Sequence, residues 1–201
     1  MTKCRGALIA IAFAAVALGC AEPPSSEIEE ARSALEAARS AEAGEYAPES
    51  LSAAEDSLAQ LEAELEAQEE KFALMRRYET SKQLAASVSE AANAAAEEAT
   101  VEKDRMQSEA SDLIASTRTQ IEETKALLEQ APTGKGTQAD IAALQADLAA
   151  AESSLAEAEA SLASGSYGDA VAKAESVQQN VQGVKMAIEE AIAARGGRRG
   201  T

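Results

Sequence analysis

Length, composition and charge limit the functions open to this chain before any motif is considered. The chain has 201 residues, of which 50 are alanine, and it contains no histidine, no tryptophan and only five aromatic residues. Its 35 acidic and 18 basic residues give a formal charge of −17, which excludes the basic surface that nucleic-acid binding needs. Without histidine there is no imidazole base and no imidazole metal ligand. We predict no catalytic residue, no metal site and no cofactor.

Residues 1–19 have the features of an export signal. Lys3 and Arg5 form a short positive segment, and an apolar run from Gly6 to Leu18 follows. At 1.5 Å per residue this run reaches about 20 Å, which is too short for a hydrocarbon core of about 30 Å. Its length is typical of a secretory signal peptide. An ordinary signal peptide and a lipoprotein signal peptide both fit this pattern.

The next residues favour the lipoprotein alternative. The sequence Val16-Ala17-Leu18-Gly19-Cys20 resembles a bacterial lipobox. The resemblance implies cleavage between Gly19 and Cys20 and acylation of Cys20 with fatty acids such as palmitate, which leaves residues 20–26 as a lipidated tether. Several acyl chains hold a protein on a membrane far more firmly than one. Because Ala21 follows Cys20, the enteric sorting rule implies the outer membrane, with the inner membrane as the alternative.

The first part of the exported chain is predicted to be helical. Ser26 and Glu29 have the spacing of a capping box for a helix over about 27–43. Gly44 suits the residue just past the end of that helix, and Pro48 suits the first turn of the next helix, over about 49–76. Apolar residues recur at heptad spacing along this second segment: Leu51, Ala54, Leu58, Leu61, Leu65, Phe72 and Met75.

An internal repeat extends the helical pattern to the rest of the chain. A shift of 90 residues places Leu51, Leu58 and Leu65 on Ile141, Leu148 and Leu155, and a shift of 89 places Tyr78 on Tyr167. The repeat predicts a turn near Arg77-Tyr78, with one uninterrupted helix through this position as the alternative. A long helix over about 79–131 and helices over about 137–164 and 167–195 then follow.

These elements define the expected fold. We predict an all-α protein of elongated antiparallel helical hairpins, or a coiled-coil-like bundle, with two similar three-helix units joined by a long helix. The first helical unit covers 27–100. The connecting helix and the second unit cover 101–195, and a flexible basic tail covers 196–201.

The segment from Ile28 to Gln68, with its Ala-x-x-Ala pattern and its Ala-Gly-Glu-Tyr-Ala-Pro turn, resembles a family of alanine-rich bacterial envelope proteins. That family shares domain of unknown function 4398. Its members are often lipoproteins, and some are fused to peptidoglycan-binding modules. The resemblance implies helical hairpins and a place in the cell envelope, and it carries no known activity or site.

Two basic segments are candidate interaction sites. Arg76 and Arg77 lie beside Tyr78, and Arg198 and Arg199 lie near the end of the chain. The alternative for the first segment is local pairing with residues such as Phe72 and Glu79, and the alternative for the second is a frayed end. The loop Gly134-Lys135-Gly136-Thr137 lacks the spacing of a phosphate-binding loop, and the carboxylates of Glu62, Glu66, Glu69 and Glu70 are expected on a solvated helix face.

The sequence therefore favours a non-enzymatic outer-membrane lipoprotein of the bacterial cell envelope that faces the periplasm. Its expected role is structural, as a spacer, or in protein interaction. The alternative is a periplasmic adaptor or chaperone-like helical-repeat module that binds peptides or envelope partners. The expected partners are the membrane, through the N-terminal lipid, and envelope or peptidoglycan-associated proteins. Self-association stays open, because the same apolar stripes can pack within one chain or between two.

Overall fold

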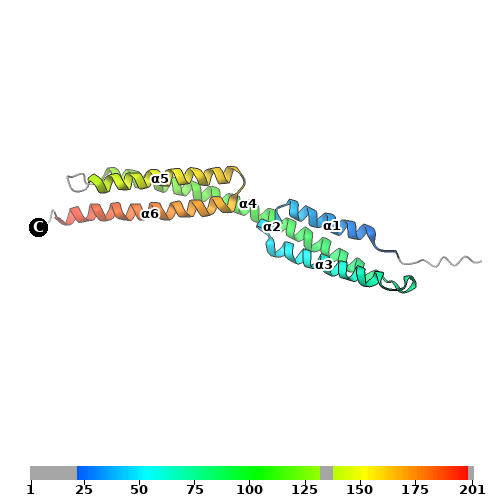
Figure 1. The fold of residues 1–201 in the computed structure, drawn as a ribbon. Helices are drawn as coiled ribbons and strands as arrows, with labels where there is room; N and C mark the ends of the chain where they lie inside the picture. Colours follow the sequence, from blue (N-terminus) through cyan, green and yellow to red (C-terminus); the bar gives the residue numbers. More distant parts are fainter. Residues whose placement is uncertain (1–21, 132–137, 199–201) are drawn as a thin grey trace, which may run out of the picture. The chain divides into compact units, whose positions relative to one another are not determined.

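The computed structural model describes residues 22–131 and 138–198, and every regular element in them is a helix. The predicted all-α fold is confirmed (Figure 1). The elements are α1 (Ser25–Ser40), α2 (Ala43–Tyr46), α3 (Pro48–Glu69), the short 3-10 helix η1 (Ala73–Met75), α4 (Glu79–Glu129), α5 (Gln138–Ala163) and α6 (Tyr167–Arg198). A turn does separate α3 from α4, as the repeat predicted, and the alternative of an uninterrupted helix through Arg77-Tyr78 is wrong.

The chain forms two compact units. Of the described residues, unit 1 contains those up to Ala37 and Glu49–Ala94, and unit 2 contains Ala38–Pro48 and those from Ala95 onward. The 51-residue helix α4 contributes its first part to unit 1 and the rest to unit 2. Within α4 the division falls after Ala94, whereas the predicted boundary between the two parts was at 101, and unit 2 also includes the end of α1 and the short helix α2.

The core of unit 1 is built from α1, α3 and the first part of α4, and small residues dominate it. One layer joins Ala31, Leu61, Ala85 and Val88, and a second layer joins Leu35, Ala54 and Ala92. Alanine has the best helix propensity, and its small side chain lets neighbouring helices approach closely. A few large side chains are therefore enough to fill this interior.

The core of unit 2 is built in the same way from the second part of α4, α5 and α6 (Figure 1). Its larger layer contains Ile114, Ile121, Ala151, Leu155, Ala158, Ala174, Val177 and Val181. Positions that the repeat aligns are buried in both units: Ala85 and Val88 correspond to Ala174 and Val177, and all four are at most 1% exposed. The internal repeat therefore reflects a shared burial pattern.

The helix ends explain where the chain turns. After α5, Gly165 has φ +84, the left-handed conformation that glycine adopts readily. The amide of Gly165 donates to Leu162 O at 3.2 Å, and the amide of Ser166 donates to Ser161 O at 3.0 Å. These two bonds satisfy carbonyl groups at the end of α5 and form a Schellman motif.

Two predicted helix ends are wrong. At the end of α1 the left-handed residue is Glu42 (φ 61), and Gly44 lies inside α2. The amide of Glu42 donates to Arg39 O at 3.0 Å, so α1 closes two residues before the glycine. At the start of α1, Ser26 does not form a capping box, because the helix already begins at Ser25 and the Ser26 hydroxyl donates to Glu27. Pro48 does begin α3, as predicted.

The heptad pattern of α3 ends earlier than predicted. Phe72 and Met75 were expected in the core stripe, but α3 ends at Glu69, and these side chains are 72% and 71% exposed. The buried positions of α3 are Ala54, Leu61 and Gln68. At the other end of the chain, α6 continues to Arg198, three residues past the predicted helix end at Arg195.

Candidate functional site

The connection between α3 and α4, residues 70–78, contains the candidate residues Arg76, Arg77 and Tyr78. The guanidinium of Arg76 donates to Glu69 O at 2.8 Å and to Lys71 O at 3.1 Å. It therefore satisfies backbone carbonyls that the end of α3 leaves open. Arg76 therefore makes local contacts at this bend, as the alternative for the cluster expected, although its partners are backbone carbonyls rather than Phe72 or Glu79.

Gln68 fixes the same connection from the inside of unit 1. Its side chain is only 4% exposed. Its amide nitrogen donates to Glu64 Oε1 at 2.7 Å, and its oxygen accepts from the backbone amide of Arg77 at 2.9 Å. A polar side chain at a core position is stable only when its groups are paired, and here that pairing positions the backbone of the connection.

The predicted basic–aromatic cluster is divided between surface and interior. Tyr78 is 5% exposed, and its hydroxyl has no hydrogen-bond partner among the described residues. Arg77 lies on the surface. The exposed aromatic residue of this connection is instead Phe72, joined by Leu74 and Met75. The polar Gln68 at a heptad core position was the sequence signal that could have indicated the end of the apolar stripe.

A second group of polar contacts, around Lys103 in unit 2, was not predicted. The Lys103 ammonium donates to Glu42 Oε2 at 2.7 Å, and it lies 5.7 Å from the centre of the Tyr46 ring. The hydrogen bond to Glu42 raises the pKa of Lys103, and burial raises the pKa of Tyr46. The Tyr46 hydroxyl donates to Gly165 O at 3.3 Å. These contacts attach α2 to α4 and to the α5–α6 turn, which is a structural role.

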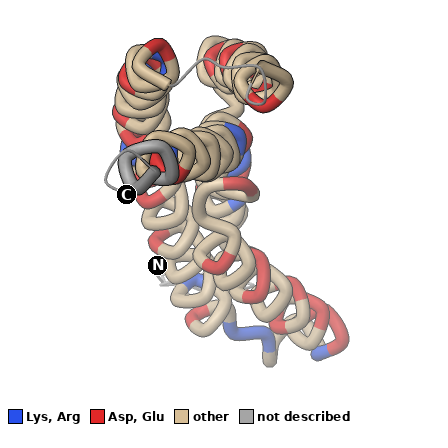
Figure 2. Tube along the Cα trace, turned by 90° about the vertical axis from the view of Figure 1, so that its left-hand side faces the viewer, with Lys and Arg blue, Asp and Glu red and all other residues tan. Residues whose placement is uncertain are grey.

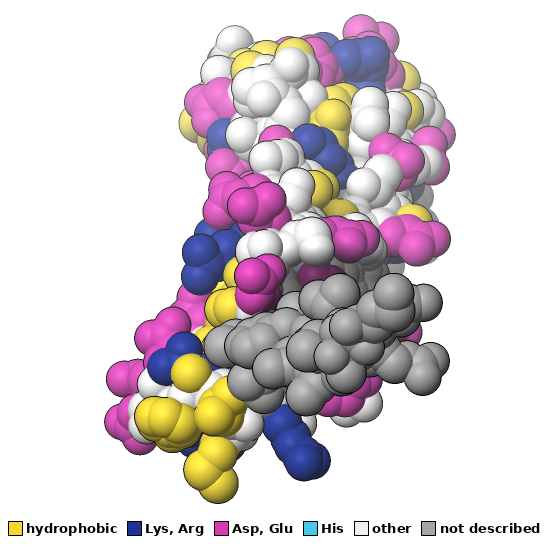
Figure 3. Space-filling model, turned by 90° about the vertical axis from the view of Figure 1, so that its right-hand side faces the viewer, with side chains coloured by type: hydrophobic (Ala, Val, Ile, Leu, Met, Phe, Trp, Pro, Cys, Tyr) yellow, Lys and Arg dark blue, Asp and Glu magenta, His cyan; other side chains and the backbone are white. Residues whose placement is uncertain are grey.

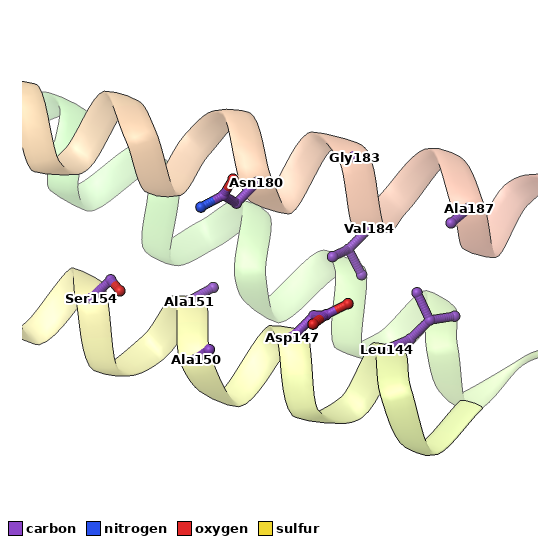
Figure 4. A pocket seen from close by; sticks show the side chains of 9 residues that line it. All are labelled: Leu144, Asp147, Ala150, Ala151, Ser154, Asn180, Gly183, Val184 and Ala187. Atoms are coloured by element: carbon purple, nitrogen blue, oxygen red, sulfur yellow. The ribbon is translucent and has the colours of Figure 1, made fainter. Parts of the chain in front are cut away.

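A shallow groove runs between α5 and α6 in unit 2 (Figure 4). It has a volume of about 490 Å³. Its lining is mostly small, because alanine, serine and glycine face it from both helices. The full set is Leu144, Asp147, Ala150, Ala151, Ser154, Asn180, Gly183, Val184 and Ala187. Asp147, Ser154 and Asn180 carry the polar side chains in it that could orient a ligand, and all three are exposed.

Acidic residues are spread along the helices (Figure 2). Glu62 pairs with Arg32 at 3.3 Å in unit 1, and Glu66, Glu69 and Glu70 are exposed. Within residues 22–131 and 138–198, no three Cys, Asp or Glu side chains come together as metal ligands. None of the described helices combines the length and the hydrophobicity of a membrane-spanning segment.

Several predicted residues lie outside the described part of the chain. They are Gly19 and Cys20 at the expected lipobox, the loop 134–137, and Arg199. Arg198 is the last residue of α6. No protein-family model matches this chain, and comparisons with curated proteins and with solved structures find no match. The resemblance to alanine-rich envelope lipoproteins therefore stays a prediction.

Proposed function

We propose that this chain is a non-enzymatic, lipid-anchored protein of the bacterial cell envelope, with a structural or protein-interaction role in the periplasm. The observation that carries the proposal is the lipobox-like sequence Val16–Cys20 after a positive segment and a short apolar run. A thiol acylated at Cys20 and an acylated amine would hold the protein on the outer membrane.

The described body supports a structural role. Its interior consists of helical layers filled largely by alanine, and its carboxylates lie mainly on exposed helix faces. Enzyme sites need reactive groups in a partly closed cleft, where burial and neighbouring charges change their pKa values. The α5–α6 groove has a single carboxylate, Asp147, and its lining carries no histidine or cysteine. A spacer or scaffold requires only stable helices and an accessible surface.

The experiment is to express the full chain and its Cys20→Ser variant in a Gram-negative host. Wild-type protein should incorporate radiolabelled palmitate, enter the detergent phase of Triton X-114 and fractionate with outer membranes. The Cys20→Ser variant should lose the label and remain in the aqueous phase. A Cys4→Ser variant is the matched control, since Cys4 lies in the segment to be removed, and it should behave like wild type. Palmitate label on the Cys20→Ser variant, or its entry into the detergent phase, would contradict the proposal.

The α5–α6 groove favours one second candidate, a periplasmic adaptor that binds a helix or extended peptide. Small side chains allow a partner backbone to approach closely, and Leu144 and Val184 supply apolar contact. A photo-crosslinking amino acid at Asn180 should then capture a partner in cells. The same amino acid at Glu175, which is exposed on α6 outside the groove lining, is the control. Equal capture from both positions would argue against an adaptor groove.

A further inference from the structure

The connection between α3 and α4 exposes three large apolar side chains within four residues. Phe72 is 72% exposed, Leu74 62% and Met75 71%. Single exposed apolar residues are common on protein surfaces, but a group of them marks an interaction site. Figure 3 shows hydrophobic side chains gathered at the lower end of the view, with Lys and Arg beside them.

This group is held outward by the polar contacts of the connection. Met75 N donates to Phe72 O at 2.7 Å in η1, and Arg76 and Gln68 fix the residues on either side. The backbone therefore has its own set of hydrogen bonds, and the apolar side chains take no part in them. The exposed apolar side chains therefore lie on a backbone whose conformation is fixed by hydrogen bonds. This distinguishes them from apolar side chains that are exposed because a chain end is not folded.

The charge of the connection is opposite to that of the chain. Residues 70–78 contain Lys71, Arg76 and Arg77 and a single acidic residue, Glu70, whereas the whole chain has a formal charge of −17. Exposed apolar groups with adjacent cations suit the interface of an anionic bilayer, where acyl chains lie just below phosphate groups. The acidic surfaces of the helices are, by contrast, repelled by such a bilayer.

The connection lies at the same end of unit 1 as the start of α1. Ala31 packs in one layer with Leu61, and Leu35 packs in the next layer with Ala54, so α1 and α3 run in opposite directions. From the first of these layers, α1 extends back six residues to Ser25 and α3 extends forward eight residues to Glu69. At 1.5 Å per residue these distances are about 9 and 12 Å, so the two ends are almost level.

Only a short step of chain separates Cys20 from the start of α1. The five-residue step from Cys20 to Ser25 spans at most about 18 Å. An acyl group on Cys20 would place this end of unit 1 at the surface of the membrane that holds it, and the opposite end away from it.

We infer that residues 70–78 are a second membrane contact, in which Phe72, Leu74 and Met75 enter the interface of an anionic bilayer. Lys71 and Arg77 lie on the lipid phosphates, while Arg76 keeps its place at the end of α3. This inference rests on the proposed acylation of Cys20. Two contacts at one end of unit 1 restrict its tilt on the membrane more than a single lipid anchor does.

A single tryptophan tests this inference, because the chain contains none. Lipidated protein carrying Phe72→Trp is reconstituted on vesicles that contain phosphatidylglycerol, with or without brominated acyl chains. We expect a blue-shifted emission and a loss of roughly half of the fluorescence on brominated vesicles, as for a side chain about 5–10 Å below the headgroups. The control is Ser52→Trp, because Ser52 is exposed and lies 17 residues, about 26 Å, along α3 from Glu69 within the same unit. Its emission should stay unquenched.

Vesicle sedimentation of the same samples separates the two proposals. If both variants sediment and only the Phe72→Trp variant is quenched, both the anchor and the second contact are supported. If the Phe72→Trp variant sediments without being quenched, the second contact is overturned and the lipid anchor stays intact. Lipidated protein that fails to sediment overturns the anchor, and the second contact with it. Equal quenching of the Phe72→Trp variant on neutral phosphatidylcholine vesicles contradicts the role given to Lys71 and Arg77.

Discussion

Two threonines of α4, one heptad apart, allow a direct test of how buried hydroxyl groups affect stability. Thr117 and Thr124 are both 0% exposed in unit 2. Thr124 donates to Gln120 O at 2.7 Å, whereas the hydroxyl of Thr117 has no hydrogen-bond partner among the described residues. A buried polar group without a partner costs about 1–3 kcal/mol. Valine has nearly the same shape, so Thr117→Val should raise the free energy of unfolding by about 1–2 kcal/mol.

The matched variant is Thr124→Val, which loses one hydrogen bond worth about 1 kcal/mol and gains a similar amount from the added methyl group. The free energy of unfolding of Thr124→Val should therefore stay close to that of the parent. Both variants are compared with the parent chain beginning at Ala21, by urea denaturation followed with far-UV circular dichroism. The slope of the transition should be unchanged in each case. The reasoning would be refuted if Thr117→Val lowered the free energy of unfolding. It would also be refuted if Thr124→Val raised that free energy by as much as Thr117→Val does.

Three further predictions concern the core of unit 1 and the helix ends, and urea denaturation measures the stability change in each. Leu61→Ala should cost about 2–5 kcal/mol, because Leu61 is 0% exposed, whereas Leu74→Ala in the exposed connection should change stability little; equal losses would contradict the assigned core. Gln68→Leu should cost about 1–3 kcal/mol and speed hydrogen exchange at the Arg77 amide, because that amide loses its acceptor. Gln68→Glu keeps an acceptor and should preserve the protection of that amide. Gly165→Ala should cost about 1 kcal/mol because of its positive φ, whereas Gly183→Ala, inside α6 with open space around it, should gain about 0.5–1 kcal/mol; a gain at both positions would argue against strain at residue 165.

The helices and most of the turns could be predicted from the sequence, because periodicity and helix propensity are local properties. Pro48 and Gly165 mark their turns directly, and the repeat marked a turn near Tyr78 that contains neither glycine nor proline. Glu42 could not be predicted as the left-handed residue. Gly44, two residues later, is the residue type that favours this conformation, and the Lys103 ammonium that pairs with the Glu42 carboxylate lies 61 residues away in the sequence. The sequence of the loop 134–137 and the run of carboxylates from Glu62 to Glu70 do not indicate which distant residues lie beside them. The composition also gave no reason to expect a site at either place.

The clearest failure of the prediction is also informative about function. The repeat aligns Phe72 with Leu162 and Met75 with Gly165, at a shift of 90 residues. In unit 2 the helix continues through Leu162, which packs against the core, and Gly165 then closes a tight turn. In unit 1 the helix stops at Glu69, and the aligned residues are exposed.

The two units share a burial pattern but differ at this position. Unit 2 packs the apolar side chain against its core, whereas unit 1 exposes it. Residue 75 is methionine, whereas the aligned Gly165 closes the turn in unit 2. In unit 1 the connection is longer, and hydrogen bonds from Gln68 and Arg76 fix its backbone. Exposure of Phe72 has an energetic cost, because burial of a large apolar side chain is worth about 1.5–3 kcal/mol. Unit 2 shows that this architecture can partly bury the equivalent residue, Leu162. The displayed apolar group is thus a property of this connection rather than of the helical repeat, which is why we assign it a contact of its own.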